Sequence, residues 1–332
     1  MTSKCLQVDF WNVGQGDASS ILIEESNERI VLDVIDVGPS RNQFVAWICS
    51  PRSKRIIIRN LILTHNDADH VDGLVSILKE RNVTIERALI LEDRATVFPQ
   101  NSAIGMLLSL HRDIISRLER DGEERVLDAF GDYRLTVAYP KAVDNMFFKG
   151  KPNDTSAIIH LFHTDPEGAA KTLLITWAAD NKLRTVMNNT PPGTRMLFGP
   201  HHGSPQDRRC GKYSHYVSMI SPGKCFFLSF ATVNAYTHPK KTYIKSLVKN
   251  NCGVICAQCA RECGKDRKTP VLDGDGFYSL LVPNGNGRSV ACHGHVRLRI
   301  DGSDVKDELA EEYAEAKKEV SDALCSPGGW QS

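Results

Sequence analysis

The sequence predicts an α/β fold in which two β-sheets are sandwiched between helices. Segments of alternating or continuous apolar residues, which are typical of strands, recur from the N-terminal region to about residue 300. Helical patterns, with apolar residues three and four positions apart, lie between them. Polar clusters follow directly after several of the strands. Two facing sheets whose outer faces are covered by helices would satisfy this pattern.

The individual elements can be assigned in chain order. We expect strands at residues 6–13, 19–24, 29–37, 56–64, 87–93, 133–140, 155–162, 171–180, 194–200 and 224–231, with two or three more between 273 and 300. We expect helices at residues 43–49, 71–82, 102–120, 239–249 and 304–324, the last as a charged surface helix. In the segment "VGQGDA", Gly14 and Gly16 bracket a turn that Asp17 helps to shape.

The composition is that of an ordinary globular protein. The chain has 332 residues, of which 41% are hydrophobic and 24% are charged. Its formal net charge of +1 provides no global field for nucleic acid, so such contacts would depend on local basic stretches. No apolar run is long enough for a transmembrane helix, and the N-terminal residues lack the apolar core of a signal peptide. We therefore expect a cytoplasmic protein without membrane contacts.

The segment "THNDADHVDG", which begins at Thr64, is the strongest indication of chemistry. It follows the apolar run 56–64 and forms the loop before a helix expected to start near Val71. Four of its side chains are typical metal ligands, namely His65, Asp67, Asp69 and His70. Imidazole and carboxylate groups together suit zinc, manganese or iron. Three aspartates in so short a segment would repel one another without a cation, so the pattern predicts a divalent metal site.

A series of motifs in the same order resembles the metallo-β-lactamase superfamily, and within it the hydrolase domain of ComEC-type DNA-uptake proteins. The motifs are "FWNVGQGDASSILIE", "IDVGP", "THNDADH", "NDTSAIIHL", "LLITWAAD", "GPHHGSPQD" and "AYTHPKKTYIKSL". The resemblance covers roughly residues 5 to 250. It implies an αββα sandwich of the metallo-β-lactamase type, here with a Cys-rich C-terminal extension.

The resemblance also implies a ligand set for one or two divalent ions, Zn or Mn. The implied metal ligands are His65, Asp67, Asp69, His70, Asp180, His201 and His202, where one or both of the last two complete the shell. The implied supporting residues, which orient ligands by hydrogen bonds, are Asp36, Asn153 and Ser156. The first two ligands would hold one ion and the next two the other, with Asp180 bridging them.

The implied catalytic residues are Asp69, His202 and His238, of which Asp69 or a histidine would manage the proton. Asp67 stands where the wider superfamily has histidine, and this harder ligand shifts the preference toward manganese without excluding zinc. The third motif carries Asn153 and Ser156 instead of a histidine. A centre with one ion, or with a second ion that binds only with substrate, is therefore the alternative to a dinuclear centre.

A group of cysteines forms a second cluster. Four of the ten cysteines lie between residues 252 and 263, and "ACHGH" adds another cysteine and two histidines. The spacing suits a structural zinc site, for which the candidate ligands are Cys256, Cys259, Cys263 and Cys292. Buried thiols without metal are the alternative, and no thioredoxin-like context supports a redox pair.

These patterns divide the chain into three expected parts. Residues 1–250 form the hydrolase domain, 251–300 a Cys/His-rich insert with strands packed on that domain, and 301–332 a charged helix and tail. The expected function is a metal-dependent phosphodiesterase or nuclease that cleaves DNA or RNA with a metal-activated water.

Two other functions remain open. The same centre could hydrolyse a small phosphodiester, nucleotide or ester. The missing third-motif histidine also leaves room for a non-catalytic regulatory or interaction subunit with a degenerate metal site. Nucleic acid could be held by the basic stretches "SPRSKR", "DRR" with Lys212, and "HPKK". A protein partner in a multi-component system, such as bacterial defence, is a further expectation.

Overall fold

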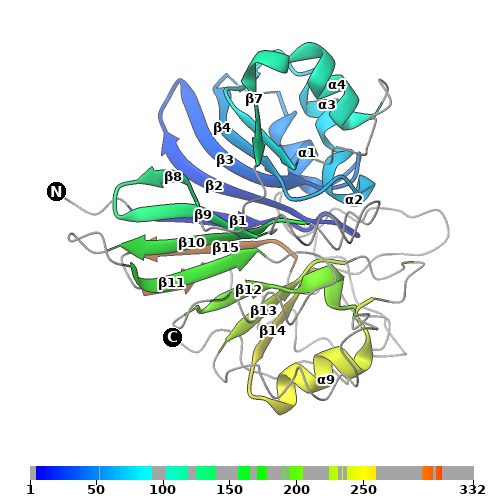
Figure 1. Ribbon diagram of the computed structural model, residues 1–332, viewed down its shortest axis with the longest axis vertical. Coiled ribbons are helices and arrows are strands. Elements are labelled where there is room, and N and C mark those ends of the chain that lie inside the picture. Colours follow the sequence, from blue (N-terminus) through cyan, green and yellow to red (C-terminus); the bar gives the residue numbers. More distant parts are fainter. Residues whose placement is uncertain are drawn as a thin grey trace.

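The computed structural model contains two β-sheets that face each other, with helices on their outer faces (Figure 1). It describes residues 5–51, 53–91, 102–118, 125–139, 156–164, 170–177, 190, 194–204, 224–230, 234, 238–258, 294–301 and 304–308. The predicted sandwich of two sheets between helices is therefore confirmed.

The first sheet contains nine strands in the described part of the chain, eight of them in the order β16-β15-β1-β2-β3-β4-β6-β7, with β5 paired to β4. Their bounds are β1 Leu6–Phe10, β2 Ala18–Glu25, β3 Arg29–Val37, β4 Arg55–Leu63, β5 Val83–Ile85, β6 Ala88–Leu91, β7 Ile115–Leu118, β15 Val296–Asp301 and β16 Asp304–Asp307. β3, β4, β6 and β7 run parallel to one another. Strands in such a parallel arrangement are covered on both faces, which explains the nearly continuous apolar run of β4.

The second sheet contains seven strands in the described residues, in the order β14-β13-β12-β11-β10-β9-β8. Their bounds are β8 Arg125–Phe130, β9 Tyr133–Tyr139, β10 Ile158–Thr164, β11 Ala170–Trp177, β12 Met196–Phe198, β13 Cys225–Leu228 and β14 Gly253–Cys256. β11 to β14 are parallel, and β8 to β11 are antiparallel. Strands that follow residue 250 thus belong to both sheets, because β14 extends the second and β15 pairs with β1 in the first.

The described helices lie outside the sheets. Their bounds are α1 Gln43–Ile48, α2 Ala68–Val71, α3 Leu74–Ile77, α4 Ala103–Leu110 and α9 Lys241–Lys249, with 3-10 turns η1 Arg112–Ile114 and η2 Pro200–Gly203. In Figure 1, α1, α3 and α4 lie beside the first sheet and α9 lies against the outer face of the second. None of the described helices is long and apolar enough to cross a membrane.

Two of the expected helices are wrong in part. The helix expected at 102–120 ends at Leu110, and Ile115–Leu118 form β7, which pairs with β6. The β-branched pair Ile114 and Ile115 favours a strand, and pairing with β6 decides the outcome. The helix expected at 304–324 begins instead as β16, where Val305 is buried and pairs with Ile300 of β15. The remainder of that expected helix, like most of residues 273–300, lies outside the described residues.

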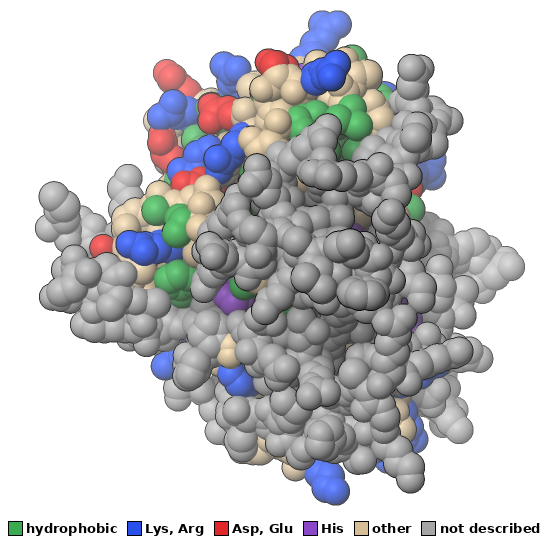
Figure 2. Space-filling model, in the orientation of Figure 1, with side chains coloured by type: hydrophobic (Ala, Val, Ile, Leu, Met, Phe, Trp, Pro, Cys, Tyr) green, Lys and Arg blue, Asp and Glu red, His purple; other side chains and the backbone are tan. Residues whose placement is uncertain are grey.

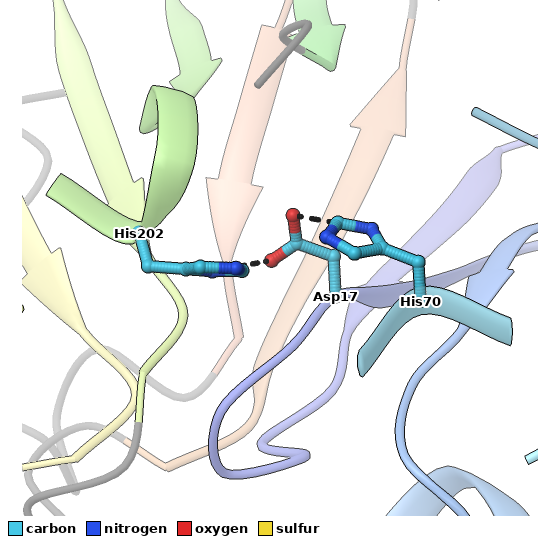
Figure 3. Close-up of side chains that lie close together, drawn as sticks. All are labelled: Asp17, His70 and His202. Carbon is cyan, nitrogen blue, oxygen red and sulfur yellow. Dashed lines mark ion pairs between the residues drawn. The ribbon is translucent and has the colours of Figure 1, made fainter. Parts of the chain in front are cut away.

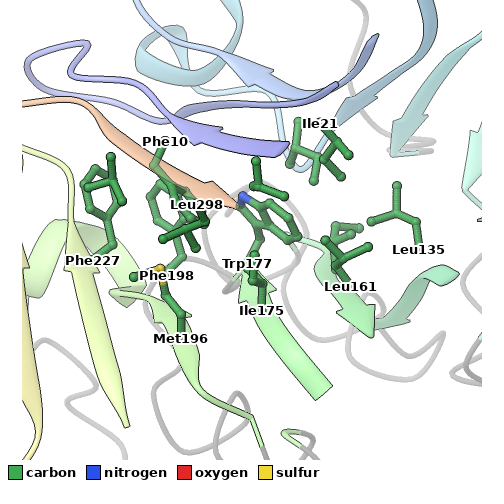
Figure 4. Close-up of a cluster of buried hydrophobic side chains, with 14 of the residues drawn as sticks. Phe10, Ile21, Leu135, Leu161, Ile175, Trp177, Met196, Phe198, Phe227 and Leu298 are labelled. Atoms are coloured by element: carbon green, nitrogen blue, oxygen red, sulfur yellow. The ribbon is translucent and has the colours of Figure 1, made fainter. Parts of the chain in front are cut away.

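The core between the sheets is rich in aromatic rings (Figure 4). Phe10 of β1 is fully buried, and its ring lies 5.7, 5.4 and 5.2 Å from the rings of Trp177, Phe198 and Phe227 of the second sheet. The indole N–H of Trp177 donates a 2.8 Å hydrogen bond to the hydroxyl of Ser19 on β2. Burial of these rings holds the two sheets together. It therefore also fixes the relative positions of the strand ends that carry the polar clusters.

Replacing Phe10 with alanine should destabilise the protein by about 3–5 kcal/mol, because the buried ring leaves a cavity between the sheets. The free energy of unfolding can be measured by urea denaturation. Val126→Ala serves as a control, since Val126 is 55% exposed and its loss should change stability by less than about 0.5 kcal/mol. Equal effects of the two substitutions would contradict the assignment of this core.

Candidate metal centre

The site begins at the adjacent ends of the parallel strands β3 and β4. Asp36 lies near the end of β3, and Thr64 directly follows β4. One carboxylate oxygen of Asp36 accepts a 2.8 Å hydrogen bond from the backbone N–H of Thr64. The other accepts a 2.6 Å bond from the Thr64 hydroxyl. Both side chains are buried, so the carboxylate has a fixed orientation.

The next two polar residues lie on a helix instead of the expected loop. α2 begins at Ala68, so Asp69 and His70 belong to its first turn. The separate helix α3 starts only after Gly73, whose N–H donates a 2.9 Å hydrogen bond to the carbonyl of Gly38. Gly73 also lies so close to β3 that a Cβ at this position would be 2.5 Å from the carbonyl oxygen of Val37. The hydrogen bond and this close contact occur at the residue that separates the two short helices.

The ring of His70 is oriented by Asp36. Its Nδ1–H donates a 2.9 Å hydrogen bond to the carboxylate, and the ring is buried. Nε2 then points away from this partner, and it is buried without a hydrogen-bond partner among the described residues. A metal ion would supply the missing partner for this buried nitrogen. A carboxylate that accepts a hydrogen bond from the other ring nitrogen is typical of metal-binding histidines.

His65 is oriented in a similar way by Thr64. Because the hydroxyl proton of Thr64 goes to Asp36, the hydroxyl oxygen can accept the Nδ1–H of His65, at 3.1 Å. Nε2 of His65 then lies 3.7 Å from the Asp67 carboxylate, and its ring centroid is 4.0 Å from that of His70. His65 and Asp67 therefore form a neighbouring pair beside His70.

His202 reaches the same group of residues from the second sheet. It lies on η2, directly after β12, where both His201 and His202 have positive φ angles of 48° and 52°. Nδ1–H of His202 donates a 2.8 Å hydrogen bond to the carbonyl of Ser229, after β13. Nε2 lies 3.2 Å from the carboxylate of Asp69. Of the two adjacent histidines, His202 is thus the one that meets Asp69.

Asp17 also belongs to the site, whereas we expected it to shape a turn beside the site. Its carboxylate lies 3.5 Å from Nδ1 of His202 and 3.9 Å from Nδ1 of His70 (Figure 3). One ligand atom from each of these three residues can be chosen so that all lie within 4.8 Å of one another, as in a metal site. The only sequence signal was the aspartate that directly follows the "GQG" turn.

The other expected site residues are placed differently. His201 faces His238, with ring centroids 5.2 Å apart, and its ring is 6.1 Å from that of His202. Ser156 is buried beside the metal loop, because the N–H of the next residue, Ala157, donates to the carbonyl of Thr64. Asp180 and Asn153 lie outside the described residues.

The expected zinc site among the cysteines can be followed only in part. Cys256 lies at the end of strand β14 and is 4% exposed. Cys252, which precedes the same strand, is also buried. Cys259, Cys263 and Cys292 lie outside the described residues, so the zinc site stays a prediction.

Three carboxylates determine the charge of His70. Burial disfavours the protonated ring, but Asp36 outweighs it through charge and hydrogen bonding, with Asp17 and Asp69 adding to the effect. Together they raise the pKa of His70 from 6.5 to about 10. In metal-free protein the ring is therefore a cation near neutral pH, and a metal ion on Nε2 would replace its proton.

No protein-family model matches the sequence, and no curated protein matches it. Among solved structures, the metallo-β-lactamase fold protein YhfI from Bacillus subtilis is similar over 76% of this chain and 96% of its own, at 12% identity and a TM-score of 0.40. A diphosphatase from the PhnP family is similar over 76% and 85%, at 11% identity and a TM-score of 0.36. Human tRNase Z, short form, is similar over 58% and 76%, at 12% identity and a TM-score of 0.32. Likeness at this level gives no information on activity or substrate.

The raised pKa of His70 predicts how the stability of chelator-treated protein depends on pH. Because the folded pKa is about 10 and the unfolded value is 6.5, folding favours the protonated ring. This contribution is complete below pH 6.5 and is lost as pH rises toward 10. In denaturant titrations, His70→Asn should therefore be most destabilising at pH 6 and much less so at pH 10. A difference from wild type that does not change with pH would contradict the charged pair with Asp36.

Proposed function

We propose that the protein is a metal-dependent hydrolase with its centre at Asp69, His70 and His202. The observation that carries the proposal is the buried Nε2 of His70, which has no hydrogen-bond partner in the described residues. The ring of His70 lies 5.6 Å from that of His202, which pairs with Asp69. His65 and Asp67 are the neighbouring pair that would hold a second ion. Asp180 remains the proposed bridging ligand on the basis of its motif alone.

The donor set fits a divalent ion of the zinc or manganese type. Neutral imidazole nitrogens and carboxylate oxygens are ligands that both metals accept. In each of the three histidines Nδ1 is engaged with an oxygen of the protein, which leaves Nε2 as the ligand atom. A divalent ion in such a site supplies an activated water near neutral pH and neutralises charge on the attacked oxygen.

The remaining residues would bind the substrate and move the proton. Asp69, at the mouth of the centre, has a side chain 31% exposed and can take part in proton transfer. His238 and His201 form a ring pair next to His202 and would contact the substrate. The backbone of His238 is held by Asn234, whose amide exchanges two hydrogen bonds with it, at 2.8 and 2.9 Å.

We propose phosphodiesters, and nucleic acid in particular, as the substrate class. This follows from the ComEC-type motif order and from the lysines of "HPKK". Lys240 and Lys241 directly follow His238 and Pro239, and the N–H of Lys240 donates to the carbonyl of Gly203, next to His202. These two lysines are therefore near the proposed centre and could bind phosphate oxygens.

The basic stretch "SPRSKR" does not contribute to this surface. Its described residues end at Arg55, the first residue of β4, whereas the centre follows the other end of the same strand, roughly 30 Å away for a nine-residue strand. Lys54 in that stretch is already paired with Glu25, at 2.7 Å. In Figure 2 the described Lys and Arg side chains over the first sheet are interspersed with Asp and Glu, so they form no continuous basic patch there. "DRR" and Lys212 lie outside the described residues.

Asp69→Asn and His202→Ala should each remove bound metal and lower hydrolysis by at least a hundredfold, because each removes a proposed ligand. Metal content is measured by elemental analysis, and activity on single- and double-stranded DNA, RNA, cyclic dinucleotides and a small aryl phosphodiester. Glu24→Gln, a change in an exposed ion pair with Arg29, is the control and should alter neither quantity. Full activity of both site variants would exclude a metallohydrolase.

The same substrate panel separates the remaining alternatives. Turnover of the aryl phosphodiester without cleavage of nucleic acid would favour a small-molecule hydrolase. Absence of bound metal after purification without chelators would favour the regulatory subunit with a degenerate metal site.

Binding to single-stranded DNA should weaken with salt through the two lysines near the centre. For Lys240→Ala and Lys241→Ala, the slope of log affinity against log salt concentration should each become smaller by roughly 0.7. Lys54→Ala is the matched control at the opposite end of β4 and should leave the slope unchanged. Fluorescence anisotropy with catalytically inactive protein measures these slopes. Equal effects of all three substitutions would contradict the placement of the DNA beside α9.

A further inference from the structure

The position of Asp17 relative to the two histidine rings distinguishes two roles for its carboxylate. As a metal ligand, Asp17 would share the ion with the Nε2 atoms of His70 and His202. Its two oxygens instead approach the Nδ1 atoms, at 3.9 and 3.5 Å (Figure 3). These Nδ1 atoms already donate to Asp36 and to the carbonyl of Ser229. The carboxylate therefore lies between the two rings, with its oxygens within 4 Å of Nδ1 atoms that are already engaged.

The turn that carries Asp17 is built against the site on two sides. On one side, the N–H of Asp17 donates a 3.3 Å hydrogen bond to the carbonyl of Asp69 in α2. Gly16 has a φ of +131°, and a Cβ there would lie only 2.0 Å from the same carbonyl oxygen. On the other side, the hydroxyl of Ser229 donates to the carbonyl of Gly16. Only glycine allows the close approach to the Asp69 carbonyl. Through the two hydrogen bonds the turn is held between α2 and the end of β13.

The base of the turn is also fixed. The side-chain oxygen of Asn12 accepts hydrogen bonds from the N–H of Gly14, at 3.3 Å, and from the amide of Gln258, at 3.1 Å. Gln258 is buried and follows β14. The turn therefore contacts parts of both sheets, and the direction of the Asp17 side chain is determined before any ligand arrives.

We propose that Asp17 is a positioning residue that couples His70 and His202 from its place between their rings. This inference rests on the proposed metal centre. His70 comes from α2 beside the first sheet, and His202 comes from η2 after a strand of the second sheet. A single carboxylate between their Nδ1 atoms keeps the two rings at a fixed separation and increases the electron density that each offers at Nε2. Metal affinity thus depends on a residue that does not touch the ion.

The test compares Asp17→Asn with His202→Ala and with a matched control. Asp128→Asn is the control. Its side chain is 18% exposed, against 16% for Asp17, and it pairs with Arg59 in the middle of β4, away from the end of the strand that leads to the site. Purified proteins are stripped with a chelator and titrated with Mn²⁺ and with Zn²⁺ by calorimetry. The visible absorption of Co²⁺-substituted protein reports the geometry of the ligands.

Asp17→Asn should keep the wild-type number of bound ions but weaken binding about 10- to 100-fold, with a shifted Co²⁺ spectrum. Asp128→Asn should bind as wild type does. Loss of the same ion that His202→Ala loses would make Asp17 a ligand and overturn the proposal. Unchanged affinity and spectrum would also overturn it. Absence of metal binding by the wild-type protein would instead overturn the proposed centre, and this inference with it.

A second variant covers the case in which Asp17→Asn folds poorly. Ser229→Ala removes the hydroxyl that holds the turn, but it leaves the Ser229 carbonyl on His202 and the Asp17 carboxylate in place. It should weaken metal binding in the same direction by a smaller factor. The double variant should be no weaker than Asp17→Asn alone, because both changes act through one carboxylate. Additive losses would contradict the coupling.

Discussion

The carboxylate of Asp36 accepts hydrogen bonds from the backbone and hydroxyl of Thr64 and from the ring of His70. A buried carboxylate is costly unless such donors surround it, so these bonds hold the ends of β3, β4 and α2 in one arrangement. The backbone of Asp36 has a φ of 53°, a left-handed conformation that is sparsely populated outside glycine. Such local strain persists only where the surrounding structure enforces it, as at functional sites.

The orientation of the histidines follows from this carboxylate and from comparable oxygen acceptors. Because Thr64 gives its proton to Asp36, its oxygen is left to accept from His65. His202 has the Ser229 carbonyl as its own acceptor. In each ring the nitrogen that could bind metal is selected by a hydrogen bond on the other nitrogen, and the rings are ordered in advance. Ordering of ligands before binding lowers the entropic cost of holding an ion.

The two halves of the site belong to different sheets, so its geometry depends on the packing between them. Phe10 of the first sheet packs on Phe198 and Phe227, which lie on the strands that precede His202 and Ser229. The aromatic core therefore sets the distance between α2 and η2. Asp17 contacts both elements, because its N–H donates to the carbonyl of Asp69 and its carboxylate lies 3.5 Å from Nδ1 of His202. Packing, hydrogen bonding and charge thus act on the same few side chains.

Local patterns predicted the sandwich and the cluster from His65 to His70, because strand periodicity and ligand spacing are properties of neighbouring residues. The same reasoning made residues 102–120 one helix, because the apolar spacing fits a helix and the pairing of Ile115–Leu118 with β6 is a contact between distant residues. It also placed Asp69 and His70 on a loop. The choice of His202 over His201, and the inclusion of Asp17, were decided by the tertiary structure alone. Gly16 and Ser229 are 213 positions apart, and only the packing of two sheets brings such distant groups within hydrogen-bonding distance.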